Sequence, residues 1–155
     1  MFVGIVPLFD VNAIALFDSG ATHSFVASSF VQAHKLEMTK DDKGWNISIP
    51  IGVNQIVLWV CSGCPLILGH LTLPADLIVL DMRDFDIILG MDWLSEHHAF
   101  IDCREKRVLF EIPGEGTCYY EGVRVNAPKA SSAKLTCVLG EIRSEGYLVS
   151  IQEVD

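Results

Sequence analysis

The chain has 155 residues, half of them hydrophobic, which is enough to bury a substantial core in one domain. Its formal net charge is −9, and its eleven Lys and Arg residues are spread along the chain, so it repels phosphate backbones and anionic membranes. The composition therefore predicts no nucleic-acid partner, no membrane partner and no disorder throughout the chain.

The location of the protein is predicted from its N-terminus and its cysteines. The chain has no apolar run of the ~18 residues that span a bilayer, and residues 1–7 lack the cationic start of a signal peptide. We therefore expect a cytoplasmic, reducing location and five free thiols. Cys61 and Cys64 form a C-x-x-C pair, but no second such pair accompanies it. Two buried thiols near a turn are favoured over a redox or metal site, and no cofactor or metal is expected.

The first third of the chain predicts a strand hairpin and a short helix. Residues 2–9 and 11–17 are two apolar runs joined by a tight turn, as in a β-hairpin. The second run leads directly into Asp18. Apolar residues recur at helical spacing over 25–34, and Ser24 is a candidate N-cap for that helix.

A second hairpin is expected after a charged stretch. Residues 37–44 are predicted to form an exposed loop because they carry most of the early charges. Residues 45–50 and 55–60 then flank a tip at 51–54 that contains Gly and Asn. Such a projecting hairpin is either a lid over a site or an ordinary connection, and the pattern alone leaves both open.

The rest of the chain predicts more strands and then a less apolar tail. Further strands are expected at residues 65–73, 75–80, 87–89, 100–103 and 107–112, with a helical turn at 92–97. His97 and His98 are expected to be solvated. The acids between 81 and 86 do not form a calcium loop, since its Gly and closing Glu are missing. In the tail we expect a short helix over 129–139 and a strand over 147–151. The prediction is thus an all-β domain over residues 1–113, followed by an extension over 114–155.

Asp18 is the candidate catalytic group. It ends an apolar strand, where a carboxylate must reach water or find partners, because an unpaired buried charge is costly. Acids held against apolar walls are typical of catalytic sites. Asp18-Ser19-Gly20 is also a common turn sequence, so these three residues alone favour an ordinary hairpin turn, and the rest of the chain has to decide.

Three segments together resemble one family. They are A-L-F-D-S-G-A-T-H-S-F at 15–25, A-D-L-I-V-L-D-M-R-D-F-D-I-I-L-G-M-D-W-L at 75–94, and F-I-D-C-R-E-K-R-V-L-F at 100–110. This set resembles the retropepsin-type aspartic protease of gypsy-type long-terminal-repeat retrotransposon polyproteins, particularly those of plants. The resemblance covers residues 2–113, and the tail resembles the connector to reverse transcriptase. It implies an acid-protease barrel with one or two short helices, half of a twofold homodimer.

The resemblance also implies roles for particular residues. Asp18 would be the catalytic aspartate, within an active-site loop that continues through Ser19, Gly20, Ala21 and Thr22. Ser19 would brace the paired loops, Gly20 would allow their close approach, and Ala21 would line the substrate groove. The flap over the substrate would be formed by Pro50, Ile51 and Gly52. The element packed beneath the catalytic loop would be Ile88, Leu89 and Gly90.

The chemistry of peptide hydrolysis by acids independently requires a second carboxylate. Aspartic proteases use two carboxyl groups that share one proton, because two neighbouring carboxylates cannot both ionise. The chain has one Asp-Ser-Gly, and its in-chain rivals Asp76 and Asp86 lack the Ser-Gly that follows Asp18. A second copy must therefore supply the partner.

The predicted function is an aspartic endopeptidase that is active as a homodimer. Its polypeptide substrate is expected to be the retrotransposon's own polyprotein. The alternative is an inactive or domesticated module with the same fold that dimerises or binds peptides. Serine hydrolysis through Ser19 is rejected, because neither the G-x-S-x-G elbow nor the G-D-S-G-G surround of serine hydrolases is present.

Overall fold

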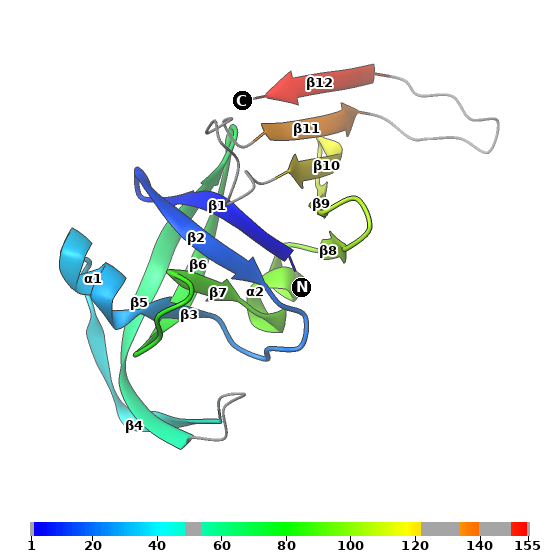
Figure 1. Cartoon of the computed structure of the whole chain (residues 1–155). Coiled ribbons are helices and arrows are strands. Elements are labelled where there is room, and N and C mark those ends of the chain that lie inside the picture. The colour runs from blue at the N-terminus through cyan, green and yellow to red at the C-terminus, as the bar shows by residue number, and fades with distance from the viewer. Residues whose placement is uncertain (1, 49–53, 122–133, 140–149, 155) are drawn as a thin grey trace.

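The computed structural model describes residues 2–48, 54–121, 134–139 and 150–154. This part of the chain contains twelve strands and two short helices (Figure 1). The strands are β1 (Phe2–Leu8), β2 (Val11–Phe17), β3 (Phe25–Ala27), β4 (Thr39–Ser48), β5 (Asn54–Leu68), β6 (Leu71–Leu80), β7 (Ile87–Leu89), β8 (Ala99–Asp102), β9 (Arg107–Ile112), β10 (Gly116–Glu121), β11 (Lys134–Leu139) and β12 (Ser150–Val154). The helices are α1 (Ser28–His34) and α2 (Met91–Glu96). The expected all-β fold with short helices is confirmed.

Seven strands form a sheet that closes into a barrel. Their order is β1-β2-β7-β3-β6-β5-β4, and β5 also pairs with β1, where Leu66 lies opposite Leu8. The closed part therefore comprises β1, β2, β7, β3, β6 and β5, and β4 lies outside it as an edge strand. The hairpin expected from residues 2–9 and 11–17 is confirmed, with Phe2 opposite Phe17.

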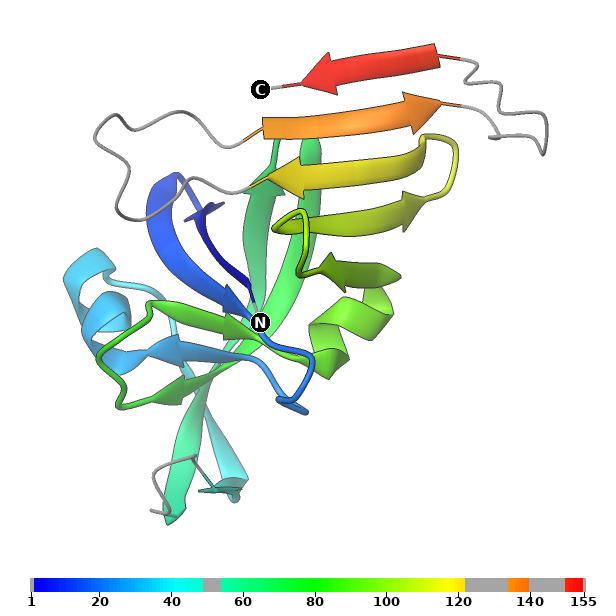
Figure 2. The same cartoon turned by 45° about the vertical axis from the view of Figure 1, so that its right-hand side comes forward.

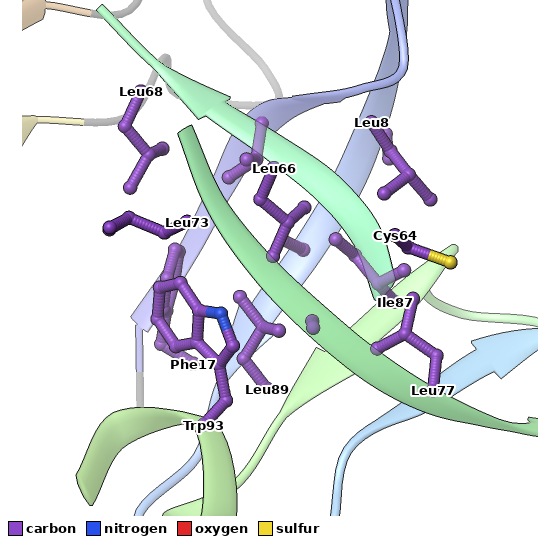
Figure 3. Close-up of a cluster of buried hydrophobic side chains, with 14 of the residues drawn as sticks. Leu8, Phe17, Cys64, Leu66, Leu68, Leu73, Leu77, Ile87, Leu89 and Trp93 are labelled. Carbon is purple, nitrogen blue, oxygen red and sulfur yellow. The ribbon is translucent and has the colours of Figure 1, made fainter. Parts of the chain in front are cut away.

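Apolar side chains from these strands fill the barrel (Figure 3). Phe17, Ile87 and Leu89 are fully buried, and the Phe17 ring lies 6.1 Å from the ring of Trp93 in α2. Burying one such side chain stabilises the fold by about 1.5–3 kcal/mol relative to leaving it exposed. The ends of β2 and β7 are thus held firmly by the core.

A second sheet of five strands, in the order β12-β11-β10-β9-β8, lies beside the barrel (Figure 2). Strands β9 and β10 lie on either side of the predicted boundary at residue 113 and pair with each other. The Tyr120 hydroxyl in β10 donates a hydrogen bond to the Ile5 carbonyl in β1 at 2.6 Å. The helix expected over 129–139 is wrong in its described part, because residues 134–139 pair with β10 as β11. The division into 1–113 and 114–155 stays a prediction.

Tyr120 predicts an alkaline limit to stability. Burial raises its pKa, whereas a Tyr in an unfolded chain ionises at about 10. Above pH ~10 the unfolded state loses a proton that the folded state keeps, so stability falls by up to ~1.4 kcal/mol per pH unit until the folded pKa is passed. We expect Tyr120→Phe to flatten this fall and to cost about 1 kcal/mol at pH 7. Urea unfolding at pH 7 and 10.5 measures both effects. Tyr119→Phe is the matched control, and an equal flattening in it would contradict the prediction.

Two predicted elements in the first half of the chain are corrected. Residues 25–27 of the expected helix form β3, because they are buried between β6 and β7 and pair with both. The helix begins only at Ser28, and Ala27 is its N-cap in place of Ser24. Residues 39–44 of the expected loop belong to β4, which tolerates their charges because it is an edge strand. Its register shifts between Lys40 and Trp45.

Corrections also arise where strands turn and where cysteines meet. The strand expected over 65–73 is split after Leu68 by a turn in which Gly69 has φ +61°. The expectation of five free thiols is wrong for Cys118 and Cys137, which lie directly opposite each other on β10 and β11 and form a disulfide. The expectation that His97 is solvated is also corrected. The residue is half-buried, and its ring lies 5.1 Å from the ring of Trp93.

Candidate active site

The position of Asp18 follows from the parallel pairing of β2 with β7. Phe17 lies opposite Leu89, so the residues that follow the two strands leave the sheet at the same edge. The Asp18 amide donates to the Leu89 carbonyl at 2.9 Å, which extends the ladder by one residue. The backbone of Asp18 is therefore fixed by a buried strand on its neighbour.

The Asp18 carboxylate is half-buried and held on one side only. Its Oδ1 accepts a hydrogen bond from the Gly20 amide at 2.8 Å. Within the described ranges, the other oxygen, Oδ2, accepts no hydrogen bond from the protein. The arrangement presents an oriented carboxylate with one oxygen available to water or to a further acid.

The loop that follows Asp18 rests on the start of α2 (Figure 2). The Met91 amide donates to the Ala21 carbonyl at 2.7 Å, and the Asp92 amide donates to the Thr22 carbonyl at 3.2 Å. The approach needs a glycine at residue 90, since a Cβ there would lie 2.3 Å from the His23 carbonyl oxygen. Exposed Ser19 and Gly20 form the outer turn of the loop.

Sequence reasoning missed the roles of two polar residues, Ser24 at the end of this loop and Asp92 in α2. Ser24 is fully buried and donates a hydrogen bond from Oγ to Oδ1 of Asp92 at 2.6 Å. The same Oγ accepts the Gly90 amide at 3.0 Å. A serine within an otherwise apolar run, 24–27, was the available signal, but it is equally typical of a helix cap.

The rival acids Asp76 and Asp86 have other partners. Oδ1 of Asp76 accepts the Gly63 amide at 2.8 Å on β5. Oδ2 of Asp86 accepts the Ile14 amide at 2.8 Å, so this carboxylate ties β7 to β2. Asp86 is half-buried and directly precedes β7. Neither carboxylate is on the loop that carries Asp18.

The hairpin expected to form a flap is confirmed in its two arms. Ser48 of β4 lies opposite Asn54 of β5, and this end of the hairpin projects away from the barrel (Figure 1). Pro50, Ile51 and Gly52 lie outside the described residues. The arms establish a projecting hairpin on the barrel, and its role as a flap stays a prediction.

The C-x-x-C pair lies in β5, at a register shift opposite β6, instead of near a turn. Cys61 and Cys64 are both buried free thiols, as expected. A hydrogen bond from Cys64 lowers the pKa of Cys61, and the same bond together with burial raises the pKa of Cys64. In the described part of the chain, no group of three or more His, Cys, Asp or Glu side chains is arranged to hold a metal ion.

Fold and site together define a class of protein. A closed β-barrel carrying an Asp-Ser-Gly loop at the shared end of two parallel strands, above an Ile-Leu-Gly strand end, is the retropepsin-like architecture. The chain belongs to the retroviral aspartyl protease family, whose sequence model matches residues 1–115. Among the described residues, no helix is both long and apolar enough to cross a membrane.

Proteins similar to this chain include longer proteins, of which the matched region is only a part. The UBA domain-containing protein Mud1 of Schizosaccharomyces pombe is 32% identical over 123 residues, which are 77% of this chain and 36% of Mud1. DNA damage-inducible protein 1 of Neurospora crassa is 27% identical over 124 residues, 78% of this chain and 26% of that protein. The chain thus spans a minor part of these relatives. The crystal structure of the retroviral protease-like domain of Ddi1 from Leishmania major matches with a TM-score of 0.59 and 18% identity. That match covers 81% of this chain and 96% of the other, and it confirms the retropepsin-like fold.

Proposed function

We propose that the chain is an aspartic endopeptidase whose active site forms when two copies bring their Asp18 side chains together. The observation that carries this proposal is the Asp18 carboxylate itself. Its backbone is fixed to Leu89, its Oδ1 is oriented by Gly20, and its Oδ2 has no protein partner within the described residues. A carboxylate held this way is suited to share a proton with a second one across a twofold axis.

The proposed reaction uses both carboxyl groups and one water. The ionised Asp18 takes a proton from the water, whose oxygen attacks the peptide carbonyl carbon, while the protonated Asp18 of the second copy donates to the carbonyl oxygen. The resulting tetrahedral diol collapses when the Asp18 that took the water's proton gives it to the amide nitrogen, the C–N bond breaks, and the ionised Asp18 of the second copy takes a proton from a diol hydroxyl. Both acids thereby return to their starting protonation states, so neither is consumed.

The remaining site residues take supporting roles in this proposal. Ser19 braces the paired loops, Gly20 permits their close approach, and Ala21 and Thr22 border the substrate. Pro50, Ile51 and Gly52 close over it as a flap, and Ile88, Leu89 and Gly90 support the loop from below. An extended peptide would bind through backbone hydrogen bonds, with specificity from apolar side pockets.

The substrate we propose is the polyprotein of a gypsy-type retrotransposon. The support for this is the set of three sequence segments that resemble the proteases of such elements. The relatives named for DNA damage and for a UBA domain favour a second candidate, a domesticated module that binds peptides without turnover. Cleavage that is blocked by a peptide mimic with a hydroxyl at the scissile position excludes this second candidate. Binding of that mimic with no cleavage supports it.

Subunit mixing tests the shared site. Equal amounts of wild type and Asp18→Asn that have exchanged subunits contain about a quarter of dimers with two Asp18 residues. We expect about a quarter of the activity of the same total amount of wild type, as measured with a fluorogenic peptide. Half the activity would mean that each copy works alone and would overturn the dimer. Mixing with Asp76→Asn, a remote exposed acid, controls for dilution.

A further inference from the structure

We propose that Ser24 and Asp92 are positioning residues that hold the loop over 18–24 so that the Asp18 carboxylate stands in its working orientation. The proposal rests on the proposed function, which requires an accurately placed Asp18. Neither residue is part of the reacting groups. Each acts through the backbone that carries Asp18.

Burial and hydrogen bonding set Ser24 apart. Its exposed fraction is 0%. Among the residues whose burial is described, the other buried ones are hydrophobic or glycine. The hydroxyl donates to Oδ1 of Asp92 at 2.6 Å and accepts the Gly90 amide at 3.0 Å. A buried hydroxyl with both a donor and an acceptor satisfied fixes its surroundings, because leaving either partner unpaired is costly.

The Asp92 carboxylate accepts three hydrogen bonds from the protein. Oδ1 accepts from the Ser24 hydroxyl and from the Trp93 amide at 2.7 Å, and Oδ2 accepts from the Ser24 amide at 3.2 Å. All three bonds need an oxygen acceptor. An Asn at this position would keep one oxygen but would turn an NH₂ group toward the Ser24 amide, which also donates.

These bonds connect directly to the backbone around Asp18. Gly90, bound by the Ser24 hydroxyl, directly follows Leu89, whose carbonyl accepts the Asp18 amide at 2.9 Å. Residues 89–92 therefore hold the loop at its first residue, Asp18, and at its last, Ser24. Releasing the last residue frees the loop to shift against β7. A displacement of about 1 Å at a catalytic group can cost ~100-fold in rate.

Asp86 offers a matched control. Its carboxylate also accepts a backbone amide of the same part of the fold, that of Ile14 at 2.8 Å, but at a point four residues before Asp18 on β2. Asp92→Asn and Asp86→Asn make the same chemical change, but an Asn oxygen can keep the single bond at Asp86, whereas both oxygens of Asp92 accept bonds. Only the first touches the loop.

Steady-state kinetics separate positioning from general stability. At a temperature well below both unfolding midpoints, we expect Asp92→Asn and Ser24→Ala to lower kcat by ~10–100-fold, with KM changed less than ~3-fold. Asp86→Asn is expected to keep kcat within ~2-fold of wild type. An Asp92→Asn variant with the kcat of Asp86→Asn would overturn the proposal. If Asp92→Asn does not fold, Ser24→Ala, which removes a single atom, carries the same comparison.

Amide hydrogen exchange tests the proposal without relying on cleavage. Asp92→Asn should speed exchange at the Asp18 and Ala21 amides by ~10-fold and leave the Ile14 amide unchanged, and Asp86→Asn, whose oxygen still accepts the Ile14 amide, should leave all three unchanged. Unchanged exchange at Asp18 in Asp92→Asn and in Ser24→Ala would overturn the positioning role. If wild type cleaves no peptide, the proposed function fails, and the difference in exchange between Asp92→Asn and Asp86→Asn still decides the role of Ser24 and Asp92.

Discussion

Asp18→Asn is expected to reduce peptide cleavage by at least ~10³-fold while leaving the barrel folded. The Asn side chain can still accept the Gly20 amide through its oxygen, so the loop keeps the bond seen at 2.8 Å. What it loses is the acid that exchanges a proton with water and substrate. The measurement is kcat/KM with a fluorogenic peptide, together with the thermal unfolding midpoint of both proteins.

Asp76→Asn is the matched control for that substitution. Asp76 also accepts a glycine amide at 2.8 Å, from Gly63, and also loses one negative charge when it becomes Asn. Cleavage by this variant should stay within ~2-fold of wild type, since surface substitutions away from special features change little. Undiminished cleavage by Asp18→Asn would refute the aspartic mechanism.

Gly90→Ala is expected to have the second largest effect, on both stability and cleavage. The new Cβ would lie 2.3 Å from the His23 carbonyl oxygen and 2.7 Å from that of Ala21. Both are backbone atoms, so the loop must move as a whole instead of a side chain turning aside. We expect a loss of roughly 3 kcal/mol or more in unfolding free energy and at least ~100-fold in kcat. Urea unfolding measures the first effect, and steady-state kinetics with one peptide substrate measure the second.

Gly114→Ala separates this clash from ordinary backbone strain. Gly114 has φ +84°, and a Cβ added there would meet no other atom within 4 Å among the described residues. Its replacement should cost only the ~1–2 kcal/mol of a left-handed non-glycine residue and leave kcat unchanged. A Gly90→Ala protein as stable and as active as Gly114→Ala would show that the loop does not need its close approach to Gly90.

Local pattern predicted the elements whose own residues form apolar or alternating runs. The hairpin of β1 and β2, the short β7 before Gly90 and the hairpin of β8 and β9 all lie where the sequence predicted strands. Each owes its position to apolar residues that recur along the chain itself. The same reasoning failed for β3 and β11, whose residues become strands only because distant strands pair with them.

The candidate site shows the same limit. Asp18 was found from the sequence because a lone acid after an apolar run is unusual, and the Asp-Ser-Gly that it begins belongs to a recognisable set of motifs. Asp92 lies within one of the three family-like segments but gives no local sign of its role. Its partner Ser24 is 68 residues away in sequence, so only the folded chain brings the two together.

By itself the sequence determined the all-β class and the strand that leads into Asp18, and it predicts the need for a second carboxylate from elsewhere. These follow from hydrophobic periodicity and from the chemistry of a single acid, both of which are written in neighbouring residues. Only the tertiary structure decided how the loop is held, through the parallel pairing of β2 with β7, the tight approach of Gly90 and the hydrogen bond between Ser24 and Asp92. The physical reason is that these contacts join segments far apart in the chain, and their geometry is fixed by packing and not by local preference.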